Sequence, residues 1–205
     1  MSTTPLISKG MNRKLSPGGI AVFNLPAGVT CSGGRTCAGC YAMKSQRMYK
    51  SCREKRASNL VASQAPDFVE KMKAELETGH CKKTNILRFH ESGDFYAQEY
   101  INRVVEIAKA FPNKYFYAYT KRLAEFNFAE MVALPNVTLI NSHNAELPGG
   151  FNFGEKFDVL KAAQKTGAFI CPAKDGVTCN VGCDYCCSPT HKAQAESVGV
   201  VFVKH

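Results

Sequence analysis

The chain contains no tryptophan and no apolar run long enough to cross a membrane. A transmembrane helix needs about 20 consecutive apolar residues, and the first 14 residues, MSTTPLISKGMNRK, lack the apolar core of a secretory signal. Acidic residues are also scarce, with 17 Asp and Glu against 26 Lys and Arg in 205 residues. These shortages argue against a membrane-spanning or secreted protein. We therefore expect a basic cytoplasmic protein, with one domain at this length.

Cysteine, in contrast, is abundant, with ten copies. In a reducing compartment we expect free thiols, and clustered thiols are metal ligands or catalysts more often than disulfides. Cys52 and Cys81 stand alone, and a lone cysteine most simply acts as a small buried apolar residue. The other cysteines form two tight groups: Cys31, Cys37 and Cys40, and Cys171, Cys179, Cys183, Cys186 and Cys187.

Strand and helix patterns alternate along the chain. The six predicted strands cover residues 19–26, 85–90, 114–120, 137–142, 168–173 and 198–205. The predicted helices cover residues 43–64, 67–77, 98–110, 122–133, 155–166 and 190–197. The connections are long enough for crossovers between parallel strands, so we predict an α/β fold with one parallel sheet. Residues 1–18 are a lead without an assigned role, and residues 19–205 form the single predicted domain.

Polar residues and cysteines follow the predicted strands at the points where the strands end. The first cysteine group follows the first strand, residues 90–94 follow the second, residues 120–122 the third, residues 141–144 the fourth, and the second cysteine group the fifth. Loops after the carboxyl ends of parallel strands gather at one edge and carry the functional site. The sequence therefore predicts a single site at this edge.

The spacing of the thiols allows several metal centres. The first group supplies three thiolates, which suit a cubane iron–sulfur cluster with one open iron, or zinc with a fourth donor such as Cys52 or a histidine. The second group supplies four thiolates, with Cys187 as a spare, enough to coordinate fully a 4Fe-4S cluster or a structural zinc. A single centre shared by both groups is the third arrangement.

Several stretches of the sequence resemble a known family. CAGCYA, LRFHESGDFYAQEY, FYAYTKR and ALPNVTLINS are similar to the phage "gene product 88" family, over roughly residues 19–205. More distantly, the three-cysteine loop after the first strand and the ESGD turn after the second resemble radical-SAM-like phage proteins of the gene product 37/68 type. The resemblance extends to the radical S-adenosylmethionine (SAM) enzymes. It implies their partial (β/α)6 TIM-like barrel and a phage protein in the host cytoplasm.

The same resemblance implies roles for individual residues. Cys31, Cys37 and Cys40 would hold a catalytic 4Fe-4S cluster whose open iron binds the amino and carboxylate groups of SAM. The turn after the second strand would cradle SAM through Ser92, Gly93 and Asp94, with Glu91 or Asp94 as the acceptor for its ammonium group. The ends of the later strands would face the SAM carboxylate, the ribose or the substrate, through Lys121, Asn141 and His143.

The first cysteine group departs from the usual radical SAM spacing, C-x3-C-x2-C, because five residues separate Cys31 from Cys37. The usual spacing occurs at Cys179, Cys183 and Cys186, where too few residues follow to build a barrel. We interpret the second group as an auxiliary cluster or a staple, with the functional cluster at this position as the alternative.

Residues 44–56 form a basic stretch that includes Tyr49. A solvated helix face, a nucleic-acid contact and a docking site for an acidic, flavodoxin-like electron donor all suit this pattern. His90, His143 and Lys121 are the catalytic candidates, although a hydrogen-bonding role at a strand end suits either histidine equally well.

Three functions remain in competition. The first is an iron–sulfur protein with a radical-SAM-like barrel that acts on an unknown substrate. The second is a non-catalytic iron–sulfur or electron-transfer module. The third is a zinc-stapled protein that binds nucleic acid or modifies its bases.

Overall fold

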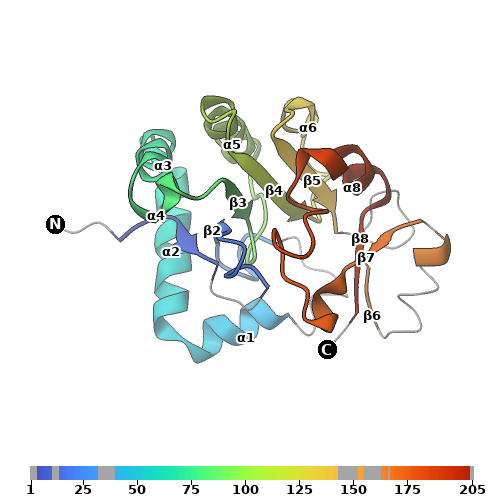
Figure 1. Ribbon diagram of the computed structural model, residues 1–205. Helices are drawn as coiled ribbons and strands as arrows, with labels where there is room; N and C mark the ends of the chain where they lie inside the picture. The colour runs from blue at the N-terminus through green and yellow to red at the C-terminus, as the bar shows by residue number, and fades with distance from the viewer. Residues whose placement is uncertain are drawn as a thin grey trace.

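The computed structural model describes residues 4–10, 14–31, 40–142, 152–154, 163–165 and 167–203. These residues form a mixed α/β fold with a five-stranded sheet in the order β1-β2-β3-β4-β5 and a three-stranded sheet in the order β6-β8-β7 (Figure 1). The strands are β1 (Ser8–Lys9), β2 (Ala21–Phe23), β3 (Ile86–Phe89), β4 (Tyr115–Thr120), β5 (Val137–Asn141), β6 (Asn152–Gly154), β7 (Phe169–Ile170) and β8 (Val200–Val203). The helices are α1 (Tyr41–Met48), α2 (Lys50–Gln64), α3 (Phe68–Glu77), α4 (Gly79–Lys82), α5 (Gln98–Ala110), α6 (Ala129–Ala133) and α8 (Lys192–Val198), with short 3-10 turns at Pro172–Asp175 and Pro189–His191.

The prediction of an α/β fold is confirmed, and that of one parallel sheet is confirmed only in part. Strands β2 to β5 are parallel neighbours in chain order, but β1 pairs with β2 in the antiparallel direction. In the described residues β7 and β8 pair with each other and β8 also pairs with β6, instead of extending the first sheet beyond β5. The described strands therefore form two sheets and close no barrel.

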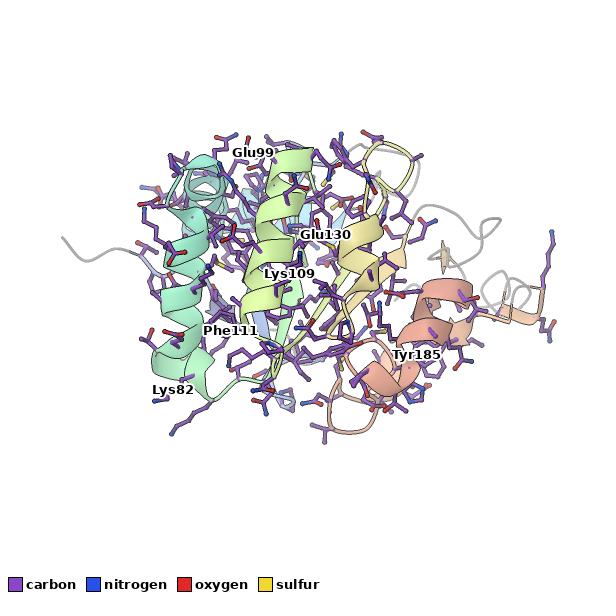
Figure 2. All side chains as sticks on the ribbon, turned by 90° about the horizontal axis from the view of Figure 1, so that it is seen from above. Lys82, Glu99, Lys109, Phe111, Glu130 and Tyr185 are labelled. Atoms are coloured by element: carbon purple, nitrogen blue, oxygen red, sulfur yellow. The ribbon has the colours of Figure 1, made fainter. Side chains whose placement is uncertain are left out.

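One face of the five-stranded sheet packs against a layer of helices. Helices α3, α5 and α6 lie along this face (Figure 1), and Figure 2 shows Lys109 of α5 beside Glu130 of α6, with which it forms an ion pair on the outer surface. The apolar residues beneath these helices alternate along the strands, as period-two side-chain geometry requires. They are Ala21, Phe23, Leu87, Phe89, Phe116, Ala118, Val137 and Leu139.

The opposite face of the sheet, here called the inner face, packs against the C-terminal cysteine segment. Its side chains come from the alternate strand positions, including Val22, Ile86, Tyr117 and Ile140. Cys171, Cys179, Cys183, Cys186 and Cys187 pack against these side chains. The second cysteine group therefore lies across the inner face and not only at the carboxyl edge that the strand order predicts.

The helices differ from prediction in two places. The helix predicted over 43–64 is divided into α1 and α2 at Tyr49, whose backbone is extended (φ −118°, ψ 110°). The helix predicted over 122–133 begins only at Ala129, because Arg122 is held in a turn, where its backbone N–H donates to the Thr120 hydroxyl. The helix predicted over 155–166 lies mostly outside the described residues.

Part of the N-terminal lead belongs to the core. Leu6, Ile7 and Leu15 are buried, and β1 extends the sheet beside β2. The carboxylate of Glu75 on α3 accepts hydrogen bonds from the backbone N–H groups of Leu6 and Ile7, at 2.5 and 2.8 Å. None of the described helices is long and apolar enough to span a membrane.

Candidate functional site

The turn after β3 is tightly packed against the turn after β2. The Ser92 hydroxyl donates to the Leu25 carbonyl oxygen at 2.8 Å, and the Leu25 N–H donates to the Ser92 carbonyl oxygen at 2.9 Å. Gly93 follows Ser92 in the turn with φ +84°, and a Cβ there would come within 2.6 Å of the Leu25 Cβ and 2.7 Å of the Thr30 hydroxyl oxygen. Both the left-handed backbone and the close approach require glycine.

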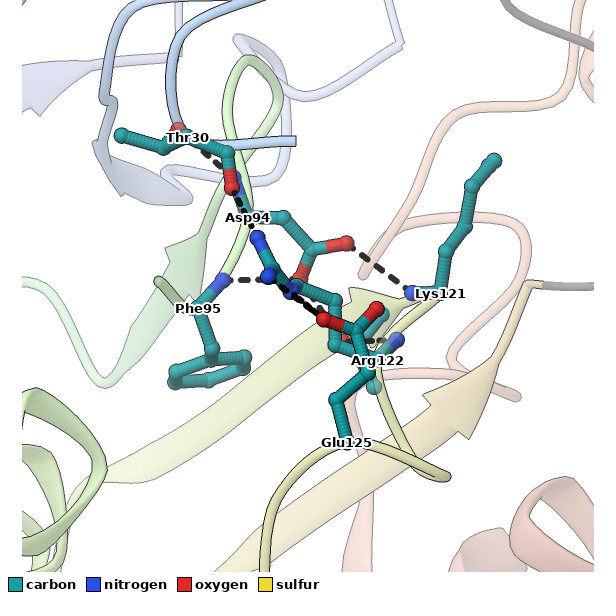
Figure 3. A network of polar contacts seen from close by, with 7 residues as sticks. Thr30, Asp94, Phe95, Lys121, Arg122 and Glu125 are labelled. Carbon is teal, nitrogen blue, oxygen red and sulfur yellow. Dashed lines mark hydrogen bonds and ion pairs between the residues drawn. The ribbon is translucent and has the colours of Figure 1, made fainter. Parts of the chain in front are cut away.

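Asp94 joins the turn after β3 to the end of β4 through its carboxylate, and to the loop after β2 through its backbone N–H (Figure 3). One carboxylate oxygen accepts hydrogen bonds from the Phe95 N–H at 2.8 Å and the Thr120 hydroxyl at 2.7 Å, and the other accepts from the Lys121 N–H at 2.9 Å. The Asp94 N–H donates to the Thr30 hydroxyl at 3.1 Å. Burial raises the pKa of Asp94, and the hydrogen bonds from Lys121, Thr120 and Phe95 oppose that rise. Asp94 therefore holds the carboxyl edge of the sheet together.

The predicted residues after β4 and β5 lie at the same edge. The Lys121 ammonium group donates to the Ser142 hydroxyl at 3.2 Å, and Asn141, at the end of β5, is buried. Thr120 and Asn141 are paired in register. The predicted site residue His143 lies outside the described residues.

His90 faces the aromatic core under the helices, which disfavours its predicted catalytic role. Its ring is 4% exposed, packs edge-on against Phe95, and hydrogen bonds to the Tyr100 hydroxyl at 2.9 Å through Nε2. Burial, and to a lesser extent the charge of Arg88, lowers the pKa of His90 to about 3. A neutral histidine at a left-handed backbone position (φ +63°) is therefore part of the packing.

The first cysteine group is anchored at both of its described ends. Cys31 directly follows Thr30, whose carbonyl oxygen accepts a hydrogen bond from the Arg122 guanidinium at 3.0 Å. Cys40 directly precedes Tyr41, whose hydroxyl donates to the Glu91 carbonyl oxygen at 2.6 Å. Cys37 lies outside the described residues. The ends of this loop are thus fastened to the turns after β3 and β4, as the strand order predicts.

The second cysteine group lines one pocket. Its five thiols come from Cys171, Cys179, Cys183, Cys186 and Cys187, and the other lining residues are Lys14, Phe169, Pro172, Ala173 and Val177. A tight turn sets the directions of two of the thiols, since the Cys183 N–H donates to the Thr178 carbonyl oxygen and the Asn180 N–H to that of Cys183. In the described part of the chain, no three His, Cys, Asp or Glu side chains are grouped tightly enough to hold a single metal ion.

The surroundings of this pocket raise the pKa of the thiols of Cys179, Cys186 and Cys187 and so disfavour their thiolate form. Burial raises the pKa of Cys186 and of Cys187 to about 12. Burial also raises the pKa of Cys179, and the positive charges of Lys14 and Arg88 oppose that rise. Thiolates here depend on positive charge nearby, from protein cations or from a metal.

Sequence reasoning missed Lys14 and Arg88. The Lys14 ammonium group donates to the Cys171 sulfur at 3.3 Å across 157 residues of sequence, and nothing in the pattern around Lys14 indicates this contact. Arg88 is a charged residue in the middle of the apolar run of β3, and that irregularity is the signal that would have drawn attention to it. Its guanidinium lies over the rings of Tyr119 and Tyr117, at 5.0 and 5.8 Å from their centroids.

The cations of the basic stretch over 44–56 are exposed except Lys55, which is half-buried, and Arg56, which is buried. The Arg56 guanidinium is buried and donates to the Ala42 carbonyl oxygen at 2.8 Å and to the Ser45 hydroxyl at 3.2 Å. Arg56 therefore joins α1 to α2 and is not available to an anionic partner. The exposed cations of the stretch are Lys44, Arg47, Lys50 and Arg53.

Residues 4–195 match the family of gene product 88. The chain belongs to this family of phage proteins. The family match covers both cysteine groups and every strand from β1 to β7. No curated protein and no solved structure shows significant similarity to the chain.

Proposed function

We propose that this member of the gene product 88 family is an iron–sulfur protein that binds a 4Fe-4S cluster through Cys171, Cys179, Cys183 and Cys186. The observation that carries the proposal is the pocket on the inner face, which these thiols and Cys187 line together. A cubane takes one thiolate at each of four irons, so its ligands surround a cavity instead of converging on one point. The donor set fits, because thiolates are the usual ligands of such clusters.

The walls of the pocket also suit a cluster. Phe169, Pro172, Ala173 and Val177 supply apolar side chains, while Lys14 donates to a ligand sulfur. Hydrogen bonds to the sulfurs and exclusion of solvent are the means by which proteins set the potential of a cluster.

A second centre at the carboxyl edge would use Cys31, Cys37 and Cys40, in a partial barrel of the radical SAM type. The anchored ends of the first cysteine loop and the rigid turn at Gly93 support this proposal. Because the Asp94 carboxylate already accepts three hydrogen bonds, Asp94 shapes the turn and Glu91 is the better acceptor for the SAM ammonium group. Lys121 and Asn141, at the ends of β4 and β5, would meet the carboxylate or ribose.

When bound and reduced, a cluster held by Cys31, Cys37 and Cys40 would supply the one electron for reductive cleavage of SAM, and Glu91 would accept a hydrogen bond from the SAM ammonium group. The products would be methionine, 5′-deoxyadenosine and a substrate that has lost one hydrogen atom. An acidic, flavodoxin-like donor would return the electron. This chain would hold SAM against the turn after β3 and surround the cluster of the second cysteine group with apolar side chains.

Anaerobic purification followed by counts of iron, sulfide and zinc tests the cluster, and paramagnetic-resonance spectra with and without SAM test the open iron. We expect iron and sulfide together, a spectrum that changes with SAM, and 5′-deoxyadenosine after reduction. Iron without any response to SAM would instead indicate a non-catalytic iron–sulfur or electron-transfer module. Zinc without iron would indicate a zinc-stapled protein.

A second candidate function, binding of nucleic acid, is favoured by the exposed surface of α1 and α2. Met48 and Tyr49 are about 60% exposed there, between the exposed cations Arg47, Lys50 and Arg53. Basic side chains with an interleaved aromatic ring suit a single-stranded backbone with stacked bases. Changing the three cations to alanine should weaken salt-sensitive binding of single-stranded DNA or RNA, while changing Lys71 and Lys73 on α3 should not. Equal binding by both variants would rule this surface out.

A further inference from the structure

We propose that Lys14 and Arg88 are the paired counter-charges of the metal–thiolate centre in the second cysteine group, and that they favour its reduced state. This inference rests on the proposed function, because it concerns the cluster in the same pocket. It assigns a role to two cations that the sequence patterns leave without one.

Lys14 makes the direct contact. Its ammonium group lines the pocket and donates to the Cys171 sulfur at 3.3 Å. The backbone around Lys14 is bound to the turn at Cys179–Cys183, here called the cysteine turn. The Cys179 N–H donates to the Lys14 carbonyl oxygen at 2.9 Å, and the Asn180 side-chain amide donates to the Gly18 carbonyl oxygen at 3.0 Å. Gly18 permits this approach, since a Cβ there would lie 2.0 Å from the Cys179 carbonyl oxygen. Lys14 is therefore positioned by the same segment that supplies the thiols.

Arg88 reaches the centre from the sheet. It is paired in register with Val22 and Tyr117, so its side chain leaves β3 on the inner face, where Cys179, Cys186 and Cys187 pack. Its guanidinium lies over Tyr119, and the Tyr119 hydroxyl hydrogen bonds with the Cys186 thiol. The tyrosine ring thus stands between the arginine and a cluster ligand.

The charge of Arg88 requires a compensating negative charge. Its Nε atom is buried without a hydrogen-bond partner in the described part of the chain, and no ion pair of Arg88 with a carboxylate occurs among these residues. Burying an arginine without such compensation is costly. The more distant Glu91 carboxylate supplies part of it. A cubane with four thiolates is doubly negative and would supply the rest, so that Lys14 and Arg88 together neutralise it. Consistent with this arrangement, the charges of both Lys14 and Arg88 act on Cys179.

The consequence is a bias toward the reduced centre. Reduction adds one more negative charge to the pocket, where low polarity strengthens the attraction to nearby cations. Removing either cation should therefore disfavour reduction without removing a metal ligand. Both residues are positioning residues, since they act on the thiolates and not on a substrate.

The test is a potentiometric titration of the anaerobically reconstituted full chain, in which Cys31→Ser and Cys40→Ser confine the signal to the second cysteine group. The variant with these two substitutions is the parent for the comparison. At its midpoint potential, we expect the added Lys14→Gln or Arg88→Gln substitution to lower the ratio of reduced to oxidised cluster about three- to tenfold. Arg88→Lys, which keeps the positive charge, should have a ratio close to that of the parent. Lys109→Gln, which removes an equal charge on the outer side of α5, should leave it unchanged.

The outcomes separate the two proposals. Iron and sulfide bound in full, with the same ratio in all variants, would overturn the counter-charge role and leave the cluster proposal intact. A parent that binds no iron, or zinc alone, would overturn both. If Arg88→Gln does not fold, Lys14→Gln decides the result, because it removes the cation that donates to the Cys171 sulfur and changes no residue of the sheet.

Discussion

The hydroxyl group of Thr120 donates a hydrogen bond of 2.7 Å to the carboxylate of Asp94, and neither side chain is more than 4% exposed. Twenty-six residues separate the two in sequence, yet the contact fastens the turn after β3 to the end of β4. The edge of the sheet that gathers Cys31, Glu91 and Lys121 is therefore built on a buried carboxylate, and its stability can be measured directly.

Changing Asp94 to asparagine should destabilise the protein. All three donors, the N–H groups of Phe95 and Lys121 and the Thr120 hydroxyl, lose their charged acceptor, and the amide NH2 faces at least one of them with a donor. A hydrogen bond to a charged group contributes about 1.5–3 kcal/mol. Urea denaturation should show that loss in the free energy of unfolding. Asp67→Asn, which removes only an exposed pair with Lys71, is the control and should change it by less than about 1 kcal/mol. Equal effects of the two substitutions would contradict the role given to Asp94.

The turn that would cradle SAM can be tested with two glycines. Gly93→Ala and Gly79→Ala both place alanine at positive φ, at +84° and +52°, so both incur backbone strain. Only Gly93→Ala also adds a Cβ against Leu25 and Thr30, and overpacking of this kind costs about 1–3 kcal/mol more. We expect the midpoint urea concentration to fall further for Gly93→Ala. If the two variants unfold at the same concentration, the turn is looser than the close contacts indicate.

His90 should make the protein sensitive to mild acid. Its folded-state pKa of about 3 lies below the ordinary value, so the unfolded chain binds the proton first as the pH falls. The stabilisation is complete at neutral pH and decreases as the pH drops through the ordinary histidine range, by about 2 kcal/mol at pH 5. The free energy of unfolding measured from pH 7 to pH 5 should show this slope.

The variants His90→Asn and His80→Asn test whether His90 causes this dependence of the free energy of unfolding on pH. Asparagine tolerates the left-handed backbone at position 90 and does not titrate, so His90→Asn should lose most of the pH dependence, whatever its effect at pH 7. His80 lies on α4, outside the group of Phe89, Phe95 and Tyr100 that His90 contacts, and its variant should keep the slope of the natural chain. A slope that persists in His90→Asn would show that another group is responsible.

Much of the fold follows from local patterns. The helix predicted over 98–110 matches α5 residue for residue, because Ile101, Val104, Val105 and Ala108 recur at helical spacing and Pro112 follows. Each of the six predicted strands contains one of the observed strands, since short runs of aromatic and β-branched residues identify them. Strand β1 has only two residues, too few for an alternating pattern, and is defined by its pairing with β2.

The site is harder to predict than the fold, because contacts between segments distant in sequence determine where its residues lie and how they are oriented. The edge that carries Glu91, Asp94 and Lys121 was predicted from the strand order. The location of the second cysteine group on the inner face depends on the docking of Cys179 against residues 14–18, which no local pattern shows. The inward orientation of His90 depends on its left-handed backbone, which the polar sequence around it does not indicate.

That docking contact yields a further prediction. Gly18→Ala should displace the cysteine turn, because the new Cβ would lie 2.0 Å from the Cys179 carbonyl oxygen, whereas Gly19→Ala meets nothing within 4 Å and incurs only the strain of φ +65°. We expect Gly18→Ala to lower both the unfolding midpoint and the metal content of the purified protein, and Gly19→Ala to keep its metal. Full metal content in Gly18→Ala would show that the pocket does not depend on this contact.

The most direct test of the central claim is the count of iron, acid-labile sulfide and zinc in anaerobically purified natural chain, beside Cys183→Ala and Cys81→Ala. A cluster in the second cysteine group predicts about four iron and four sulfide for each centre in the natural chain. Cys183→Ala should lose one such centre, and Cys81→Ala should lose none, because Cys81 is buried away from the pocket. Zinc without iron, or an iron content that Cys183→Ala leaves unchanged, would contradict the account.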